Sequence, residues 1–318
     1  MAEVFDREAG QFVCDFVEQL PTTSTGKNFS LYDWEIDTIM DFYGTKEDVD
    51  GELLRKYWYL YLEIPKKNGK SELAAALGLY HLFGDGELNA EVYVCAADKD
   101  EATIIFNNAH FMLTTAPWTA KMLATGELNV TESRKLIEFR RQQFHENGGW
   151  EWVTVGRMKV LSSEAYSKHG LKPSCVIFDE LHAQPNRDLW DVMTFGAGSG
   201  RKQPSWIVLT TAGDDPDRAS IGWEVHEKAV AVRDARKLRK ILDEGGDPRQ
   251  VLSLRRVADD DLPGKIEELL ERDLPNWLPV MYGLTAMVGD DPEDLEILKR
   301  RLNLFAGKDM YSLELNGG

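Results

Sequence analysis

Residues 64–71 (IPKKNGKS) place basic, glycine and hydroxyl residues in an order that can bind a phosphate. They follow an apolar stretch typical of a buried strand and precede an alanine- and leucine-rich stretch typical of a helix. The free N–H groups and positive dipole at a helix N-terminus favour an anion there. In such a loop Gly69 would let the backbone approach the phosphates, Lys70 would reach the β- and γ-phosphates, and the Ser71 hydroxyl would bind Mg²⁺. The generic pattern asks for Gly at position 64, where this chain has Ile, so for this segment alone a charged turn that opens a helix is an equal alternative.

A pair of adjacent carboxylates, Asp179 and Glu180, ends a second apolar run, CVIF. P-loop ATPases use the first acidic residue at such a strand end to hold Mg²⁺ and a following Glu to polarise the attacking water. An exposed acidic strand end is the plain alternative. The pair follows the GKS segment in the order that an ATPase requires, which favours the nucleotide interpretation.

A third apolar run, residues 206–209, ends in Thr210, Thr211, Ala212 and Gly213. Hydroxyl groups at a strand end beside the Asp-Glu strand can sense the γ-phosphate and pass its loss to the next part of the chain. A turn rich in Thr and Gly is the alternative. Three strand ends in this order together predict a phosphate site.

The elements that must position these residues alternate along the chain. Strands are predicted over residues 57–64, 91–97, 152–155, 158–161, 174–179 and 205–211, and helices over 29–44, 70–83, 99–115 and 189–195. This alternation predicts an α/β fold with a mainly parallel sheet covered on both faces. Residues 45–52 (TKEDVDGE) are interpreted as an acidic connector. Beyond residue 213 a long charged helix over 221–242 and short helices over 250–271 predict a small helical subdomain, and residues 293–304 form one weak helical pattern.

The composition is that of a globular protein that carries an excess of acid. The chain has 318 residues, 43% hydrophobic and 29% charged, with a net charge of −17. Acidic excess disfavours nucleic-acid binding, but residues 57–213 carry 16 basic and 18 acidic side chains, which leaves a local basic groove possible. The three cysteines lie far apart, which argues against a disulfide scaffold and a Cys-rich zinc site, and no zinc spacing is seen among His169, His182 and His226. Neither a signal peptide nor a membrane span is expected.

Four segments together resemble the ATPase domain of the large terminase subunit of tailed phages, the motor that packages DNA into procapsids. They are IPKKNGKSELAAALGLYHL, AEVYVCAADKDEATIIFNNA, CVIFDELHAQ and RKQPSWIVLTTAG, and the resemblance covers residues 29–285. It implies a P-loop NTPase of the additional-strand, catalytic-glutamate type with a small helical lid. NWLPVMYG, at residues 276–283, also resembles a stretch that follows the family's ATPase core.

The resemblance implies roles for individual residues, with ATP and Mg²⁺ as cofactors. Lys70 and Ser71 would bind nucleotide and Mg²⁺, Asp179 the metal, Glu180 would be the catalytic carboxylate, and residues 210–213 would form the coupling motif. The remaining loop residues Pro65, Lys66, Lys67, Asn68 and Gly69 would line the phosphates. The implied partners are double-stranded DNA, the portal protein, the small terminase subunit and further copies of the chain in a ring, in the host cytoplasm and without a membrane.

Two features depart from the family pattern. The family often has an aromatic-Gln adenine contact, and here Trp34 is followed by Glu35, whose carboxylate accepts from the adenine amino group but cannot donate to N7. Family members also continue into a nuclease domain. The stretch 285–318 is interpreted as a tail without that domain, and Asp259, Asp260, Asp261, Asp290 and Asp291 as solvated loop carboxylates, so no nuclease activity is expected from this chain.

The cation that stimulates hydrolysis has two candidate sources. Arg201 could act in trans as an arginine finger, or Lys66 or Lys67 could supply the charge in cis. A solvated loop Arg is the alternative for Arg201. The basic clusters at residues 134–135, 140–141 and 233–240 could contact DNA phosphates, or could equally be solvated faces.

The resulting hypothesis is an ATPase module that hydrolyses ATP to drive double-stranded DNA into procapsids. Its predicted parts are an N-terminal, adenine-side segment (1–56), the ATPase core (57–213), a helical lid (214–284) and the tail (285–318). The alternatives are a helicase-like or other DNA-remodelling P-loop ATPase and a non-catalytic remnant of a split terminase.

Overall fold

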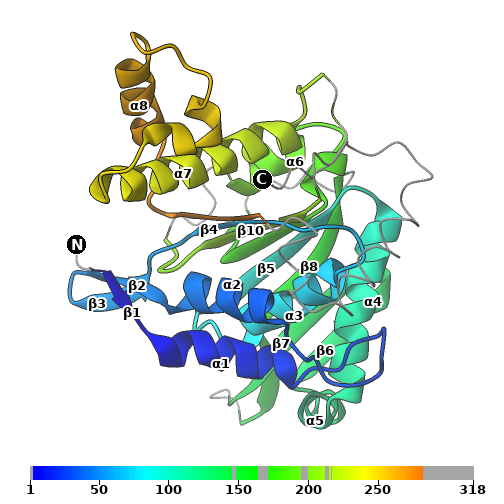
Figure 1. Ribbon diagram of the computed structural model, residues 1–318. Helices are drawn as coiled ribbons and strands as arrows, with labels where there is room; N and C mark the ends of the chain where they lie inside the picture. The colour runs from blue at the N-terminus through cyan, green and yellow to red at the C-terminus, as the bar shows by residue number, and fades with distance from the viewer. Residues whose placement is uncertain are drawn as a thin grey trace.

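A computed structural model describes residues 3–144, 148–163, 171–194, 200–211, 215 and 217–281. Its centre is an eight-stranded sheet in the order β11-β4-β10-β9-β5-β8-β7-β6 (Figure 1). These strands are β4 (Tyr59–Glu63), β5 (Ala90–Ala96), β6 (Leu128–Thr131), β7 (Leu136–Phe144), β8 (Trp150–Ser162), β9 (Cys175–Asp179), β10 (Ser205–Thr210) and β11 (Trp277–Met281). The neighbours from β11 to β8 pair in parallel, and β7 and β6 continue the sheet antiparallel. The predicted α/β fold with a mainly parallel sheet is confirmed.

Strand β10 lies between β4 and β9, although it follows both in the chain. In the register of the sheet Thr210 stands opposite Glu63, and Leu209 stands opposite Asp179. The carboxyl ends of the three strands therefore lie side by side. This insertion of β10 between the other two is the additional-strand arrangement that the resemblance implies.

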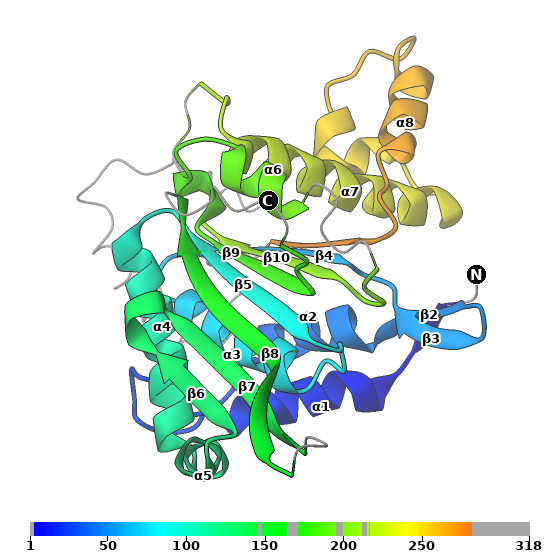
Figure 2. The same cartoon turned by 180° about the vertical axis from the view of Figure 1, so that it is seen from behind.

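Helices cover both faces of the sheet (Figures 1 and 2). One face packs against α1 (Arg7–Glu18), α2 (Asp33–Gly44), α3 (Lys70–Phe83), α4 (Lys99–Thr115) and α5 (Pro117–Thr125). The other face packs against α6 (Asp188–Thr194) and the first half of α7 (Ile221–Asp243). Along β4 the side chains alternate between the layers, with Leu60 and Leu62 in the first core and Tyr61 in the second.

The second half of α7 leaves the sheet and forms a small core of its own. Leu238 and Ile241 pack there with Leu254 and Leu269. The partners belong to the short helix η5 (Leu252–Leu254), which follows η4 (Pro248–Gln250), and to α8 (Leu262–Glu271). Helices are therefore present within residues 221–243 and 248–271 as predicted, while the helical pattern at 293–304 lies outside the described residues. The chain returns to the main sheet as β11, which was not predicted. Pro279 is tolerated in β11 because this strand lies at the edge of the sheet.

Several elements differ from the sequence-based expectation. The two strands predicted within residues 152–161 are one long strand, β8, which pairs with the unpredicted strand β7. The expected acidic connector is a hairpin of β2 (Thr45–Val49) and β3 (Glu52–Arg55), to which β1 (Glu3–Phe5) adds a third strand. Polar residues are frequent in this hairpin, so its sequence lacks the apolar run that would predict a strand. The domain boundaries at residues 56, 213 and 284 stay predictions, and the tail lies outside the described residues.

A buried ion pair joins elements at the amino ends of the parallel strands. Arg55 at the end of β3 contacts Asp85 after α3 at 2.9 Å, and both side chains are 3% exposed. Arg55 also donates to Oγ of Ser205 at the start of β10, and His81 in α3 contacts the other oxygen of Asp85 at 2.9 Å. The Arg55 and His81 charges hold the pKa of Asp85 well below its usual range despite burial, which acts in the opposite direction.

Across the described part of the chain, none of the helices combines the length and the apolar character that crossing a bilayer requires.

Candidate functional site

The loop between β4 and α3 has the backbone geometry of an anion cradle. Gly69 adopts a left-handed conformation with φ of +72° immediately before α3, and Lys67 has φ of +70°. Left-handed backbone suits glycine, and successive turns of this kind direct N–H groups into a concavity. The Asn68 amide donates to the carbonyl of Pro65 at 3.0 Å, and the N–H of Ile64 donates to Thr210 O at 3.0 Å, which ties the loop to β10.

Lys70 begins α3 and points at the carboxylate of Glu180. Its Nζ lies 3.3 Å from Glu180 Oε1, and its side chain is 6% exposed. Glu180 follows β9 in a left-handed conformation, with φ of 50°, and its N–H donates to Leu209 O at 2.8 Å. A non-glycine residue in this conformation is strained and is common where function fixes the geometry. The lysine predicted to bind phosphate thus meets the candidate base, with Lys70 buried and Glu180 half-buried.

Ser71 and Asp179 form the second pair of the site. Ser71 Oγ donates to Asp179 Oδ2 at 2.9 Å. Oδ1 of Asp179 is buried and accepts no hydrogen bond from any described residue. Burial, with the negative charge of Glu180 as a smaller contribution, raises the pKa of Asp179 to about 6, although the Ser71 hydrogen bond acts in the opposite direction. Such an orphaned buried oxygen beside a hydroxyl fits Mg²⁺, which prefers hard oxygen ligands and takes few from the protein.

Thr210 and Thr211, which were predicted to couple hydrolysis to the rest of the chain, lie at the same ends of the strands. The N–H and the Oγ1 of Thr211 donate to Glu180 Oε2 at 3.0 and 3.2 Å. Thr211 therefore contacts the candidate base directly. Ala212 and Gly213, the other two predicted coupling residues, lie outside the described residues.

His182 is a member of the site that the sequence-based assignment missed. Its Nδ1 lies 3.2 Å from Glu180 Oε2 and 3.0 Å from Thr210 Oγ1. Burial lowers the pKa of His182, and the positive charges of Lys66 and Lys70 add to that effect, while the negative charge of Glu180 opposes it. In the sequence this histidine is weighed only as a possible zinc ligand, without the spacing that zinc requires. Its place two residues after Glu180 was the available signal.

The predicted adenine contacts lie in the first turn of α2. Trp34 and Glu35 are both buried. Glu35 Oε2 accepts from the N–H of Tyr32 at 2.9 Å, as in a helix-capping interaction, and burial raises the pKa of Glu35 to about 7. Unpredicted contacts occur nearer the phosphate loop, where Thr23 Oγ1 and Ser24 N donate to Glu72 Oε1 in the first turn of α3, at 2.6 and 2.8 Å.

Arg201 lies away from the site of its own chain, and its predicted role in trans stays a prediction. It precedes β10 and therefore lies at the amino ends of the parallel strands, opposite the phosphate loop. Its guanidinium donates to the carbonyls of Leu88, Asn89 and Lys172, and its side chain is 11% exposed. An arginine finger needs a free guanidinium, whereas this one holds three loop segments together.

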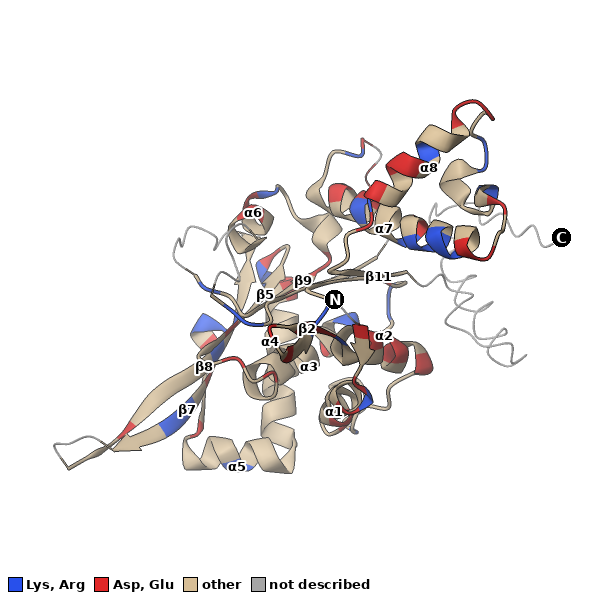
Figure 3. Ribbon diagram, turned by 90° about the vertical axis from the view of Figure 1, so that its left-hand side faces the viewer, with Lys and Arg blue, Asp and Glu red and all other residues tan. Residues whose placement is uncertain are grey.

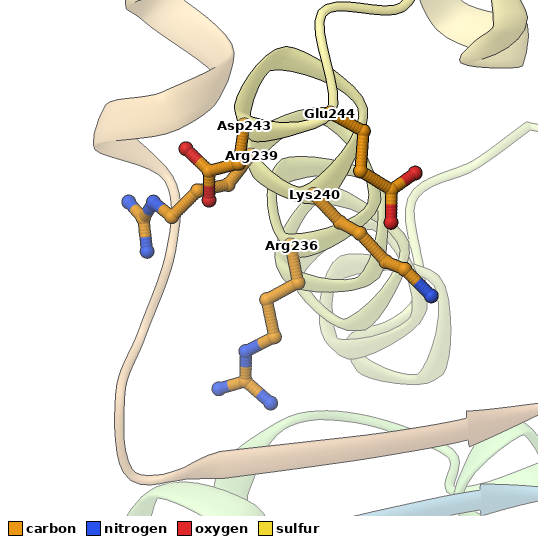
Figure 4. A pocket seen from close by; sticks show the side chains of 5 residues that line it. All are labelled: Arg236, Arg239, Lys240, Asp243 and Glu244. Carbon is orange, nitrogen blue, oxygen red and sulfur yellow. The ribbon is translucent and has the colours of Figure 1, made fainter.

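Several side chains of the basic clusters proposed for DNA contact already bind acidic or carbonyl groups of the protein. Arg236 and Arg239 in α7 both pair with Asp273, at 3.1 and 2.7 Å. They line a shallow cavity of about 290 Å³ with Lys240 and the acidic residues Asp243 and Glu244, as Figure 4 shows. Blue and red segments alternate along α7, and basic residues also lie on the projecting β7–β8 hairpin (Figure 3). On that hairpin the Arg140 side chain donates to Gly126 O at 2.8 Å.

Residues 41–227 match the family described as terminase large subunit, ATPase domain. The chain is 27% identical over 220 residues to the terminase large subunit of Enterobacteria phage HK97, an alignment that covers 67% of this chain and 38% of that protein. The crystal structure of the HK97 bacteriophage large terminase is similar with a TM-score of 0.56 and 21% identity, over 89% of this chain and 45% of that one. The large terminase ATPase domain of Thermus phage P74-26 is similar with a TM-score of 0.50 and 14% identity, over 81% of this chain and 85% of that one.

The structural likenesses show a shared fold at low sequence identity. The chain spans less than half the length of the curated relative and of the HK97 structure.

Proposed function

Because this chain belongs to the family of terminase large subunit ATPase domains, we propose that it hydrolyses ATP to drive double-stranded DNA into a procapsid. The observation that carries the proposal is the convergence of three strand ends on one site. There Lys70 lies 3.3 Å from Glu180, and Ser71 lies 2.9 Å from Asp179.

In this proposal the loop backbone and Lys70 bind the phosphates, and Ser71 and Asp179 hold Mg²⁺. The metal ion, when bound, neutralises charge that develops on the transferred phosphoryl group. Glu180 orients and deprotonates the attacking water. When ATP binds, the Lys70 ammonium group would leave Glu180 and contact the γ-phosphate, because it is attracted to the larger negative charge.

The stimulating cation is assigned to the phosphate loop. The Arg201 guanidinium donates to backbone carbonyls, which favours Lys66 and Lys67 as the source of the stimulating charge. Both are exposed in the loop, and the charge of Lys66 acts on the pKa values of His182 and Glu101. We propose that one of these two lysines supplies the charge.

The adenine and the macromolecular partners would be bound outside the phosphate site. Trp34 and Glu35 would contact the adenine, which requires the Glu35 carboxylate to exchange its cap hydrogen bond for the base. The partners would be double-stranded DNA, the portal protein and the small terminase subunit. The chain would work as a ring of copies in the host cytoplasm.

The test is steady-state ATP turnover by the purified 318-residue chain, with and without double-stranded DNA. Turnover should depend on Mg²⁺, and Lys70→Ala should abolish productive ATP binding, because it removes the buried cation that faces the phosphates. Lys121→Ala, which removes an exposed lysine of α5, is the matched control and should behave as the wild type. Near wild-type affinity and turnover in Lys70→Ala would contradict the proposal. Separation of DNA strands in a displacement assay would instead favour a helicase.

A further inference from the structure

The first turn of α7 lies directly against the backbone that follows Glu180. A Cβ atom at Gly222 would stand 2.5 Å from the Cα of His182 and 2.9 Å from its backbone nitrogen. Only a glycine allows so close an approach without displacement of one backbone. Because packed interiors transmit small shifts, movement of α7 toward this segment must also move His182.

His182 in turn hydrogen-bonds to Thr210 of β10 and lies in ion-pair range of the candidate base. The Thr210 hydroxyl donates its hydrogen to Thr211 O at 3.1 Å, so its oxygen is left as an acceptor toward the imidazole. The Glu180 carboxylate is also an acceptor. Nδ1 of His182 therefore carries the hydrogen that Thr210 Oγ1 accepts at 3.0 Å, and it lies 3.2 Å from Glu180 Oε2.

A second contact fixes α7 to the strand that leads into the phosphate loop. His226 Nδ1 lies 2.8 Å from Glu63 Oε2 at the end of β4. Helix α7 is thus held by β4 at His226, while Gly222, one turn earlier, abuts His182. The direction of the Glu180 carboxylate therefore depends on how the start of α7 is seated.

We propose that His182 is a positioning residue that aims the Glu180 carboxylate at the attacking water and makes that aim depend on the position of α7. This inference rests on the proposed ATPase function and deepens it. His182 acts through Glu180 and does not touch the nucleotide. Its loss should lower kcat and leave the KM for ATP nearly unchanged.

The experiment measures kcat and KM for ATP in four variants of the full chain: His182→Ala, His182→Asn, Gly222→Ala and Gly264→Ala. The Asn side chain places an N–H donor close to the position of Nδ1, so His182→Asn should keep kcat within about threefold of the wild type. His182→Ala and Gly222→Ala should each lose about tenfold or more in kcat, as small misplacements of a catalytic group do. Gly264→Ala is the matched control, because Gly264 also lies in the first turn of a helix and its added Cβ would meet no atom within 4 Å.

Equal loss of kcat in His182→Ala and His182→Asn would overturn the inference, because the hydrogen bond would then not be the reason. Wild-type kcat in His182→Ala or in Gly222→Ala would overturn it as well. Retained ATP affinity in a binding titration shows that each variant is folded. Wild-type turnover that Glu180→Gln removes supports the proposed function separately, so its failure and the failure of this inference are distinguishable.

Discussion

Asp179 is a residue of the site whose buried carboxylate lowers the stability of the folded protein. Its carboxylate is buried, one of its oxygens accepts no hydrogen bond from the described residues, and its pKa is raised to about 6. A carboxyl group whose pKa is higher in the folded than in the unfolded chain destabilises the fold when ionised. This cost therefore grows as the pH rises from about 4 through 6 and is fully present at neutral pH.

We therefore predict that Asp179→Asn stabilises the ligand-free protein at pH 7, by about 1–3 kcal/mol in the free energy of unfolding. The amide keeps the shape of the carboxylate and removes the buried charge. The same variant should lose the stabilisation that ATP with Mg²⁺ gives the wild type. Chemical denaturation with and without nucleotide measures both effects, and a variant less stable than the wild type without ligand would contradict this account of the site.

At this scale the sequence was informative where chemistry fixes both residue type and position. Lys70, Ser71, Asp179 and Glu180 were predicted because each must follow a strand end, and the structure brings them together. His182 was missed because its role depends on contacts with Thr210 and Gly222, which are distant in the sequence. The carbonyl groups that accept from Arg201 could not be predicted, because they belong to loops distant in the sequence.

Among the elements, the Arg55–Asp85 pair links the β3 end to the loop after α3 and to β10. Asp85→Asn should lower the free energy of unfolding by about 3–5 kcal/mol, because it leaves a buried guanidinium without its counter-charge. Asp191→Asn removes the partner of Arg187 from an exposed pair and should change it by about 0–1 kcal/mol. Urea denaturation of both variants tests this, and equal small effects would show that the buried pair contributes little.

The pH dependence of the same pair has a definite sign. The pKa of Asp85 is depressed in the fold, so its contribution is present at neutral pH and is lost as the pH falls below about 4, the pKa of an Asp in an unfolded chain. The stability difference between wild type and Asp85→Asn should therefore shrink on acidification from pH 6 to pH 3. A difference that stays constant or grows over that range would assign the effect of the substitution to packing instead.

The elements that the sequence predicted are those with apolar runs or helical periodicity. Strands β4, β5, β9 and β10 are continuous buried runs, and α3 and α4 have the predicted bounds. Strand β7 was missed because its second half is exposed and mostly polar, which leaves no strand pattern in the sequence. Strand β11 was missed because Pro279 interrupts its pattern, which is acceptable only at a sheet edge.

For the whole molecule, the acidic surface limits how DNA can be bound. The net charge is −17, and Arg236 and Arg239 are paired with Asp273. We predict weak, sequence-independent binding of double-stranded DNA by the isolated chain, with an affinity that falls about tenfold or more between 50 and 200 mM salt. Fluorescence anisotropy with two unrelated duplexes measures this, and tight, salt-insensitive binding to only one of them would contradict it.

The expectation that this chain does not cut DNA remains a prediction. The Asp-Glu pair at residues 179–180 is assigned to ATP-bound Mg²⁺, and the acidic pair at residues 290–291 lies outside the described residues. Incubation of plasmid with the chain in Mg²⁺ or Mn²⁺ tests it. Metal-dependent cleavage that persists in Glu180→Gln would show a second, nuclease site.

The central claim is that Glu180 activates water for attack on ATP held by the loop at Lys70, and single-residue kinetics test it most directly. The measurement is the steady-state ATP turnover of Glu180→Gln beside its affinity for ATP with Mg²⁺, with Glu127→Gln as a control at an exposed glutamate. The account predicts near wild-type affinity and turnover reduced by about 10²- to 10⁴-fold, the usual effect of removing a positioned base, with the control unchanged. Turnover within threefold of the wild type in Glu180→Gln would contradict it.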